Sequence, residues 1–488
     1  MPIFTNRPHR AALLLTLAGL GGGLPLMAQS LGVSARQSKA PADPNSPLLY
    51  RQDSSDEDWS FLGDPSAHAD AFGAFKYLPL GPESWYLSFG GSLRSTDEYY
   101  RNYNWGKGPQ GPDGDYLQRL MGHADVHFGD HLRLFSELDS SLEFGRTGLP
   151  TVLAEDKLDF SQLFFELNPL KSGDATDTPL SVRVGRQELN FGVGSLVATR
   201  DLNVRRPFDG IKFAFRQDGW RVDLFAVRPV VQQPDLFFSG APNPNQTFWG
   251  IWATKANVMG FVDQLDLYYL GLDRENAVFQ QGTADERRHT LGFNAHERVD
   301  GVSFFQEGDL QFGTFGSDGL LAWKFVQGMS YSVPEISLSP TFGLQGAVAS
   351  GDSQKNADLG TFYPIFPKGV YYGYLLFTSG SANIMLVHPS VTLQLSKRLT
   401  LDVDCFFLWR ESLSDGIYSQ AGMFLRPGQT TQSRYIGTIQ DLSFGWRLDG
   451  HTMVGIIAAY NEVGPYLRET QPPGKNAAYL SSTISYKF

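Results

Sequence analysis

The last ten residues of the chain form a predicted strand whose two faces differ chemically. One face carries Leu480, Ile484, Tyr486 and Phe488, and the other carries Tyr479, Ser481, Thr483, Ser485 and Lys487. Because successive side chains of a strand point to opposite sides, the first face can meet lipid while the second meets water. A bilayer accepts strands only in a closed barrel, since an open sheet edge would leave backbone groups unpaired in hydrocarbon. The segment therefore predicts a transmembrane barrel strand that ends in an aromatic residue.

The amino terminus has the features of a signal peptide. Arg7 and Arg10 precede an apolar stretch at residues 11–20, and Leu26-Met27-Ala28 offers a cleavage site. A transmembrane anchor is the alternative, but glycines and a proline interrupt residues 19–25, and a spanning helix needs about 20 apolar residues. We expect residues 1–28 to be a signal peptide, 29–84 a periplasmic N-terminal segment and 85–488 a single outer-membrane barrel.

Alternation of apolar and polar residues can be followed from Trp85 to the end of the chain and predicts about 18 strands. The expected ranges are 85–94, 116–128, 131–144, 158–168, 180–188, 208–217, 220–228, 248–257, 263–272, 287–296, 302–312, 320–330, 336–349, 384–395, 399–410, 434–448, 452–461 and 478–488. Short polar turns, such as residues 128–131 and 449–451, alternate with long connections. An even strand number with periplasmic termini places the short turns in the periplasm and the long loops outside.

The fold class that follows is all-β: a transmembrane antiparallel β-barrel in the bacterial outer membrane. A soluble β-rich enzyme or lectin is the alternative, but it would not need lipid-facing strips such as Leu442, Phe444, Trp446 and Leu448. A barrel of about 18 strands encloses an aqueous lumen. The formal net charge of −11 argues against nucleic acid as a partner.

Several motifs resemble the alginate export outer-membrane family. They are Val184-Gly-Arg-Gln-Glu-Leu-Asn-Phe-Gly192, Asn203-Val-Arg-Arg-Pro-Phe-Asp-Gly210 and Gly219-Trp-Arg-Val-Asp-Leu-Phe-Ala-Val-Arg-Pro229, with further matches from about Trp59 onward. The resemblance implies an 18-strand porin that passes an anionic polysaccharide through an electropositive constriction. One departure concerns Glu188, because the alginate porin has an arginine after its Gly-Arg-Gln motif. Ser161 and Gln162 likewise stand near positions where the family has arginines.

Lumen-facing charges are chosen as those out of phase with the apolar face. The bases are Arg94, Arg119, Arg133, Arg183, Lys212, Arg216, Arg221, Arg288, Lys324, Arg410 and Arg447, and the acids are Asp125, Glu137, Asp139, Asp223, Asp402, Asp404 and Asp441. Rings of charge bias permeation, so an excess of bases would favour anions. The alternative is that these charges are solvated or paired across strands. Arg186 is out of register with Arg183, which requires a bulge or a position at the rim.

Two long loops also carry predictions. Residues 189–207 hold Arg200, Arg205 and Arg206 near Asp201 and Asp209, and this basic cluster either meets the solute or forms a salt-bridged surface patch. The connection 350–383 is rich in aromatic residues and prolines. Long functional loops commonly fold onto their scaffold, so we expect this one to constrict the extracellular mouth.

Other chemistry is not expected. His123, Asp125 and His127 share a strand face, but alternate residues lie nearly 7 Å apart at about 3.3 Å per residue, which is too far for adjacent ligands of one zinc ion. We predict no metal, no cofactor and no enzymatic activity; a barrel hydrolase is the less favoured alternative, since no strands bring together serine, histidine and an acid. The predicted partners are an acidic polysaccharide or sugar acid, membrane lipid, and the barrel assembly machinery through Phe488. General uptake of small organic anions or oligosaccharides stays open as a second function.

Overall fold

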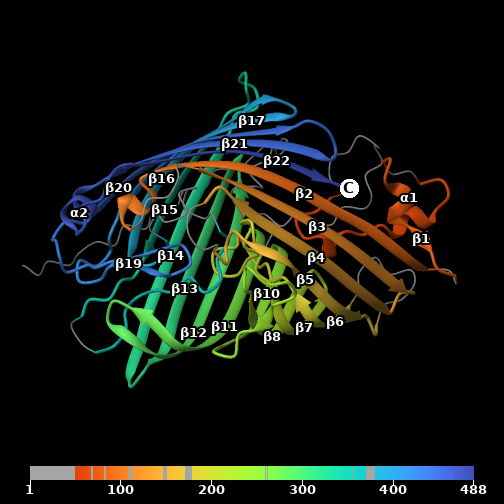
Figure 1. Cartoon of the computed structure of the whole chain (residues 1–488), viewed down its shortest axis with the longest axis horizontal. Coiled ribbons are helices and arrows are strands. Elements are labelled where there is room, and N and C mark those ends of the chain that lie inside the picture. Colours follow the sequence, from red (N-terminus) through yellow and green to blue (C-terminus); the bar gives the residue numbers. More distant parts are fainter. Residues whose placement is uncertain are drawn as a thin grey trace, which may run out of the picture.

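The computed structural model describes residues 50–67, 70–81, 84–108, 114–146, 151–170, 179–258, 260, 262–354, 357–369 and 380–488. The predicted signal peptide lies outside them. Within these residues, 18 antiparallel strands close into one barrel through pairing of the first with the last (Figure 1). The strands are β2 (Trp85–Arg101), β3 (Gly114–Phe128), β4 (Leu132–Phe144), β5 (Asp156–Leu167), β6 (Leu180–Gln187), β7 (Phe208–Gln217), β8 (Trp220–Val231), β10 (Gln246–Val258), β11 (Val262–Phe279), β12 (Gly282–Val299), β13 (Val302–Phe315), β14 (Asp318–Ser332), β15 (Thr341–Ala349), β16 (Ile384–Ser396), β17 (Leu399–Trp409), β20 (Tyr435–Arg447), β21 (Thr452–Val463) and β22 (Ala477–Lys487).

The remaining elements are short. They are the strands β1 (Leu78–Pro79), β9 (Ala241–Pro242), β18 (Ile417–Tyr418) and β19 (Phe424–Arg426), the helices α1 (Gly73–Lys76) and α2 (Pro465–Glu469), and the 3₁₀ turns η1 (Ser54–Asp56), η2 (Ser60–Gly63) and η3 (Tyr103–Gly106). No helix in the described part of the chain is long and apolar enough to span a membrane. The all-β fold class predicted from the alternating pattern is confirmed.

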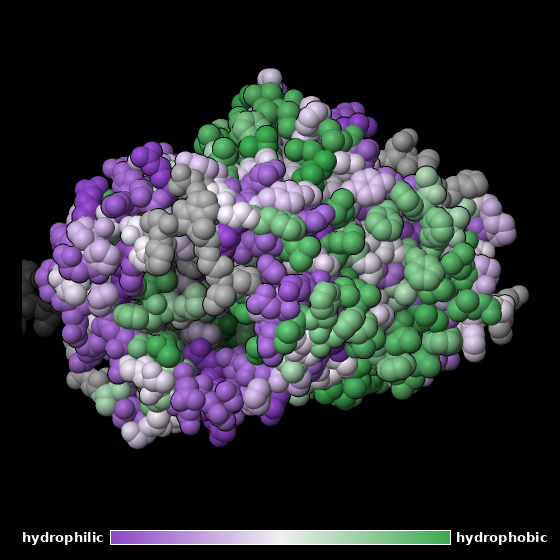
Figure 2. Space-filling view, in the orientation of Figure 1, coloured by the Kyte–Doolittle hydropathy of each residue, from purple (hydrophilic) through white to green (hydrophobic). Residues whose placement is uncertain are grey.

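The outer wall of the barrel is apolar. Large side chains such as Leu120, Phe165 and Leu321 are more than half exposed, which is the arrangement that lipid requires. Figure 2 shows apolar residues spread over the half of the molecule nearer α1, whereas hydrophilic residues gather at the end that carries α2. The short turns lie at the α1 end, so this end is periplasmic and the α2 end extracellular.

The strand boundaries differ from the prediction mainly at the end of β2, which continues to Arg101 instead of residue 94, and at the β11–β12 hairpin. The expected strands 263–272 and 287–296 extend to Phe279 and Gly282, because pairing resumes at Ala277 and Ala284 after a register shift beyond Arg274. Phe279 is buried at the hairpin tip, where its ring packs against Tyr363 and Tyr418. Contacts with distant loops therefore lengthen these strands, and local alternation does not reveal such contacts.

Two extracellular connections fold into the barrel. Because β6 ends at Gln187, the chain leaves the wall there and enters the lumen, where Leu189, Leu196 and Val197 are almost fully buried. The segment 359–368 meets it: the amide of Ala198 donates to the carbonyl of Phe366, and the amide of Phe366 donates to that of Leu196. A hydrophobic core thus forms inside the barrel against the inner faces of β8, β10 and β11.

The short β6 leaves part of the β5 edge without a strand partner. The loop between β8 and β10 covers this edge, because Phe237 bridges to Leu158 and the amide of Phe238 donates to the carbonyl of Leu158. The same loop is joined to β8 through β9. The wall is therefore completed here by a loop that comes from later in the chain.

The other extracellular connections form a packed cap. Arg410 is fully buried and donates to the carbonyls of Leu413, Asp415, Gly428, Thr431 and Ser433. The carboxylate of Asp415 accepts from the hydroxyls of Thr361 and Tyr418. One guanidinium and one carboxylate thus hold together loops that start from several strands.

The first described residues lie at the opposite end. Lys76 in α1 donates to the carbonyl of Phe488 at 3.0 Å, and Phe72 packs on the Phe488 ring. Figure 1 shows α1 and β1 beside the C-terminus. Residues 50–57 continue from this base into the lumen, where they contact side chains of β4, β5 and β6.

Replacing Arg410 by Met should loosen the cap without opening the barrel. Each buried carbonyl that loses its donor costs about 1–3 kcal/mol. We expect faster limited proteolysis within residues 410–434, while the heat-modifiable mobility of the barrel on electrophoresis persists. Arg468→Met is the matched control, because that side chain is 56% exposed. Equal protease resistance of the Arg410 variant and the parent would contradict this account.

Candidate permeation site

The loop between β6 and β7 is held by arginines of two other strands. Arg94 on β2 and Arg119 on β3 each approach a carboxylate oxygen of Asp201 to 3.1 Å, and both donate to the carbonyl of Leu202. Burial opposes ionisation of Asp201, but the guanidinium groups of Arg94 and Arg119 lower its pKa. These predicted site residues are thus brought together, and they fix the loop against the inner faces of β2 and β3.

The other arginines of this loop serve different contacts. Arg205 is buried. It pairs with Glu188 at 2.7 Å, and a carboxylate oxygen of Glu137 on β4 lies 4.0 Å from its guanidinium. Arg206 donates to the carbonyl of Pro367 and lies over the ring of Phe366. Arg200 donates to the carbonyls of Val204 and Val152. The cluster expected from the sequence is therefore divided among three separate sets of partners.

Four cations form a patch on the inner face of β6, β7 and β8, which we call the basic wall: Arg183, Lys212, Arg216 and Arg221. Arg183 and Lys212 are register partners on β6 and β7, and Arg216 and Arg221 are partners on β7 and β8. Glu166 lies 2.7 Å from Arg183, and Asp223 lies 2.6 Å from Arg221. Arg183 also lies over the ring of Phe164, 3.9 Å from its centroid.

Lys212 and Arg216 differ from their neighbours on the basic wall. Among the described residues, no carboxylate lies within 4.0 Å of either side chain. Both residues are only half-buried, so water in the lumen reaches them. The basic wall consequently carries four cations against the two carboxylates that pair with it, and its uncompensated charge faces the lumen.

Arg186 takes neither of the positions expected from its register. The pairing of β6 with β7 has no bulge, and Arg186 stands opposite Asp209, on the face opposite to Arg183. Its guanidinium pairs with Asp159 and Asp209 at 2.9 Å each and donates to the carbonyl of Gly240. Arg186 and Asp209 therefore hold the loop that covers the β5 edge.

The remaining predicted residues lie apart from the basic wall. Arg288 pairs with Glu286 and donates to Gln311 and to the carbonyl of Thr361, which attaches the inward-folded loop to the wall. Lys324 pairs with Glu307 at 2.6 Å and with Asp309 at 3.0 Å. Arg410 belongs to the extracellular cap, and Arg447 is half-buried at the periplasmic end of β20. Contact with a solute remains a prediction for all the residues named from the sequence.

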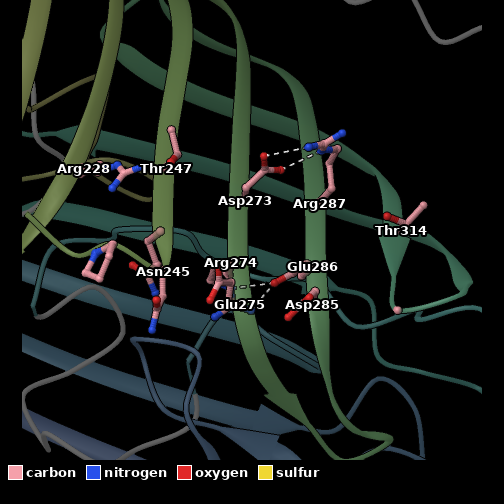
Figure 3. A pocket seen from close by; sticks show the side chains of 13 residues that line it. Arg228, Asn245, Thr247, Asp273, Arg274, Glu275, Asp285, Glu286, Arg287 and Thr314 are labelled. Atoms are coloured by element: carbon pink, nitrogen blue, oxygen red, sulfur yellow. Dashed lines mark hydrogen bonds and ion pairs between the residues drawn. The ribbon is translucent and has the colours of Figure 1, made fainter.

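A cavity of about 400 Å³ lies at the extracellular end of the strands β8 to β13. Figure 3 shows Arg228, Thr247, Asp273, Arg287 and Thr314 side by side on neighbouring strands, with the Asp273–Arg287 ion pair drawn. Their register places them in one row across these strands. Two residues away on the same outer face, the ring of His289 contacts the rings of Trp249, Tyr269 and Phe312. The row marks the level at which the outer wall changes from aromatic to charged.

The strand face of β3 that carries His123, Asp125 and His127 forms ion pairs with neighbouring side chains. Arg133 donates to both carboxylate oxygens of Asp125, and His127 lies 3.0 Å from the same carboxylate. In the described ranges, no group of three or more histidine, cysteine or acidic residues is arranged to hold a metal ion.

Residues 53–57 were missed as candidates by the sequence reasoning, which assigned their acids to the N-terminal segment. The structure places Asp53 beside Gln162 on β5, and Ser55 beside Arg133 and Arg183. The sequence does contain a pattern that could have indicated these contacts. Asp53, Asp56, Glu57 and Asp58 form an acidic run that precedes a barrel with basic lumen positions.

Replacing Phe366 by Ala should widen the lumen. Its ring packs on Phe208 and Phe248, and its backbone pairs with the other inward loop. Truncation of a buried phenylalanine costs about 3–5 kcal/mol, which is enough to release the two loops from each other. We expect larger and noisier single-channel currents than in the parent, whereas Phe424→Ala, at a half-exposed ring in the extracellular cap, should leave them unchanged. Identical currents in parent and variant would place the narrowest point elsewhere.

Comparison with solved structures places the fold among outer-membrane porins. Similar structures include OpdQ of Pseudomonas aeruginosa, with a TM-score of 0.54, 11% identity, and coverage of 82% of this chain and 98% of that chain. OccAB1 of Acinetobacter baumannii has a TM-score of 0.53, 11% identity, and coverage of 85% and 99%. OpdK of Pseudomonas aeruginosa, solved with vanillate, has a TM-score of 0.52, 12% identity, and coverage of 82% and 98%. At such low identities these likenesses show the fold alone.

Sequence comparison gives a more specific result. No curated protein matches the chain significantly. Residues 85–480, which span nearly the whole barrel, match the family described as Alginate export. The family resemblance inferred from the motifs around Arg186, Arg205 and Arg221 is thereby confirmed. The chain is a bacterial outer-membrane porin that belongs to the alginate export family.

Proposed function

We propose that this porin passes an anionic polysaccharide or sugar acid, in the manner of alginate, along the basic wall. The observation that carries the proposal is the uncompensated charge of Lys212 and Arg216, which face lumen water beside Arg183 and Arg221. A carboxylate that moves through the lumen would give up contacts with water and gain contacts with these cations. Membership of the alginate export family gives independent support for a solute of this class.

The chemistry of the basic wall suits passage better than tight binding. Arg183 and Arg221 already pair with Glu166 and Asp223, so a solute would share them rather than receive their full charge. The bidentate pairing of Arg221 with Asp223 also holds that guanidinium in one orientation. Conduction requires binding that is weak enough to be released, and partly compensated cations meet that requirement.

Uptake of small organic anions is the second candidate function. Inward folding of the loops that contain Val197 and Phe366 favours it, because these loops occupy lumen space that a polymer would use. The fold neighbour OpdK was solved with vanillate, a small carboxylate. The two functions differ in solute size: an oligouronate of several sugars should block ionic current if the polymer is the solute, whereas only monomeric acids should interact with a pore for small anions.

Replacing Lys212 and Arg216 together by Gln should weaken anion selectivity. A unit charge about 7 Å from an ion in water is worth roughly 0.6 kcal/mol, with opposite sign for chloride and potassium, so each substitution should reduce the ratio of chloride to potassium permeability by up to about sevenfold. Reversal potentials of planar bilayers in a KCl gradient measure this ratio. Arg287→Gln is the control, because it removes a positive charge from the outer wall, where the side chain is 63% exposed. Cation selectivity of the parent protein would refute the proposed function, and unchanged selectivity of the double variant would refute the role of these two residues.

A further inference from the structure

The amino-terminal segment contacts Arg183 of the basic wall and side chains of neighbouring strands. Residues 50–57, here called the acidic finger, enter the lumen from the periplasmic end. At its base, the hydroxyl of Tyr50 donates to Asp70 at 2.6 Å, and Lys487 on β22 donates to the carbonyl of Arg51 at 2.6 Å. Trp59 is almost fully buried just beyond it, with Lys76 over its ring. The base is therefore fixed to the barrel end.

The tip of the acidic finger rests on polar side chains of three strands and one loop. Gln162 on β5 donates to the carboxylate of Asp53 at 2.8 Å, and the hydroxyl of Ser54 donates to Glu137 on β4. The carbonyl of Ser55 accepts from Arg133, and its hydroxyl accepts from Arg183. Arg205 of the inward loop donates to the carbonyl of Gln52 at 3.1 Å. The tip thus lies where the inward loop approaches the basic wall.

The two carboxylates of the tip face cations. Burial opposes ionisation of Asp53, but the charge of Arg205, the amide of Gln162 and the charge of Arg183 lower its pKa. Burial and the charge of Asp53 raise the pKa of Asp56, whereas the charges of Arg183, Arg221 and Lys212 act in the opposite direction. The acidic finger therefore presents two acids, three residues apart, to the cations that the proposed function assigns to the solute.

The contacts of the tip differ in kind from those of the base. The tip carries no apolar side chain between Gln52 and Asp56, and it is held by hydrogen bonds that a carboxylated sugar could replace one for one. The base is held by aromatic packing of Tyr50, Trp59 and Phe72 around His451 and Phe488, which no sugar acid would displace. The tip can consequently leave while the base stays.

We propose that the acidic finger is a built-in competitor of the transported anion: Asp53 and Asp56 occupy a two-carboxylate site on the inner wall, and an acidic oligosaccharide displaces them. This inference rests on the proposed function for the identity of the displacing solute. It adds that the site is occupied when no solute is present, and that the occupant shares the charge of the solute. Displacement would then open the periplasmic half of the lumen when an acidic chain arrives.

Accessibility of Ser55 tests the proposal directly, because this residue is 3% exposed with the finger in place. In a Cys405→Ser background, a thiol introduced by Ser55→Cys should react slowly with a maleimide and faster when a hexauronate is added. Ser60→Cys, at an exposed position in the base, should react at the same rate with and without the sugar. Current block by the hexauronate with no change in the Ser55→Cys rate would refute the finger proposal while leaving the proposed function intact.

Charge removal gives a second readout that needs no solute. Asp53→Asn with Asp56→Asn keeps the shape of the tip but removes its charge, so the Ser55→Cys thiol should become reactive without sugar. Block by the hexauronate should also tighten roughly three- to tenfold, which corresponds to a site whose available fraction rises from about 10–30% to nearly all. Asp58→Asn with Asp64→Asn removes the same charge from exposed positions and should change neither quantity. An unreactive thiol in the first variant would show that the finger is a fixed structural element.

If the hexauronate neither blocks current nor alters labelling in the parent, the proposed polymer function fails. The charge variant then decides the finger proposal separately, because its labelling depends only on Asp53 and Asp56. A reactive thiol would retain the competitor role toward a smaller anion. If the Ser55→Cys thiol reacts as slowly in the charge variant as it does in the parent, the competitor role is refuted.

Discussion

The pairing of β2 with β22, from Ser92 opposite Lys487 to Arg101 opposite Ala478, is the constraint on which the rest of the molecule depends. Within hydrocarbon every backbone group needs a partner inside the protein, so the sheet must close on itself. Closure at this strand number leaves a wide lumen. The chain fills much of it with its own loops, and a hydrophobic core forms where a simple aqueous channel would otherwise run.

Charge pairing determines where these loops lie. Asp201 is held by Arg94 and Arg119, Arg205 by Glu188, and the segment around Thr361 by Arg288. Most of these lumen bases are therefore engaged in structure, and the basic wall is a region where positive charges outnumber the carboxylates that pair with them. A pore can in this way be acidic in overall composition and still present cations along the path of the solute.

The sequence predicts those features that depend on local alternation. Strand number, strand order and the outward face follow from the two-residue period, and the predicted strand ends lie within a few residues of the observed ones except at the end of β2, at the β11–β12 hairpin and at the start of β15. Positions that depend on distant partners did not follow. Arg186 was expected at a bulge or rim and instead pins a loop, because the early end of β6 cannot be read from alternation. Arg410 faces carbonyls of several loops, and the acids at Asp53 and Asp56 meet strands far away in the sequence. Residues 355–356 and 370–379 of the connection that was expected to constrict the extracellular mouth lie outside the described residues.

The loop that covers the β5 edge has a consequence for the order of assembly. Phe237 and Phe238 pair with Leu158, and Arg186 ties Asp159 to Gly240, yet this loop follows β6, β7 and β8 in the chain. A wall built by adding strands in sequence order would keep an opening beside β5 until the later segment arrives. Assembly in that order would have two closure events: one would join the terminal strands, and the other would seal this lateral opening.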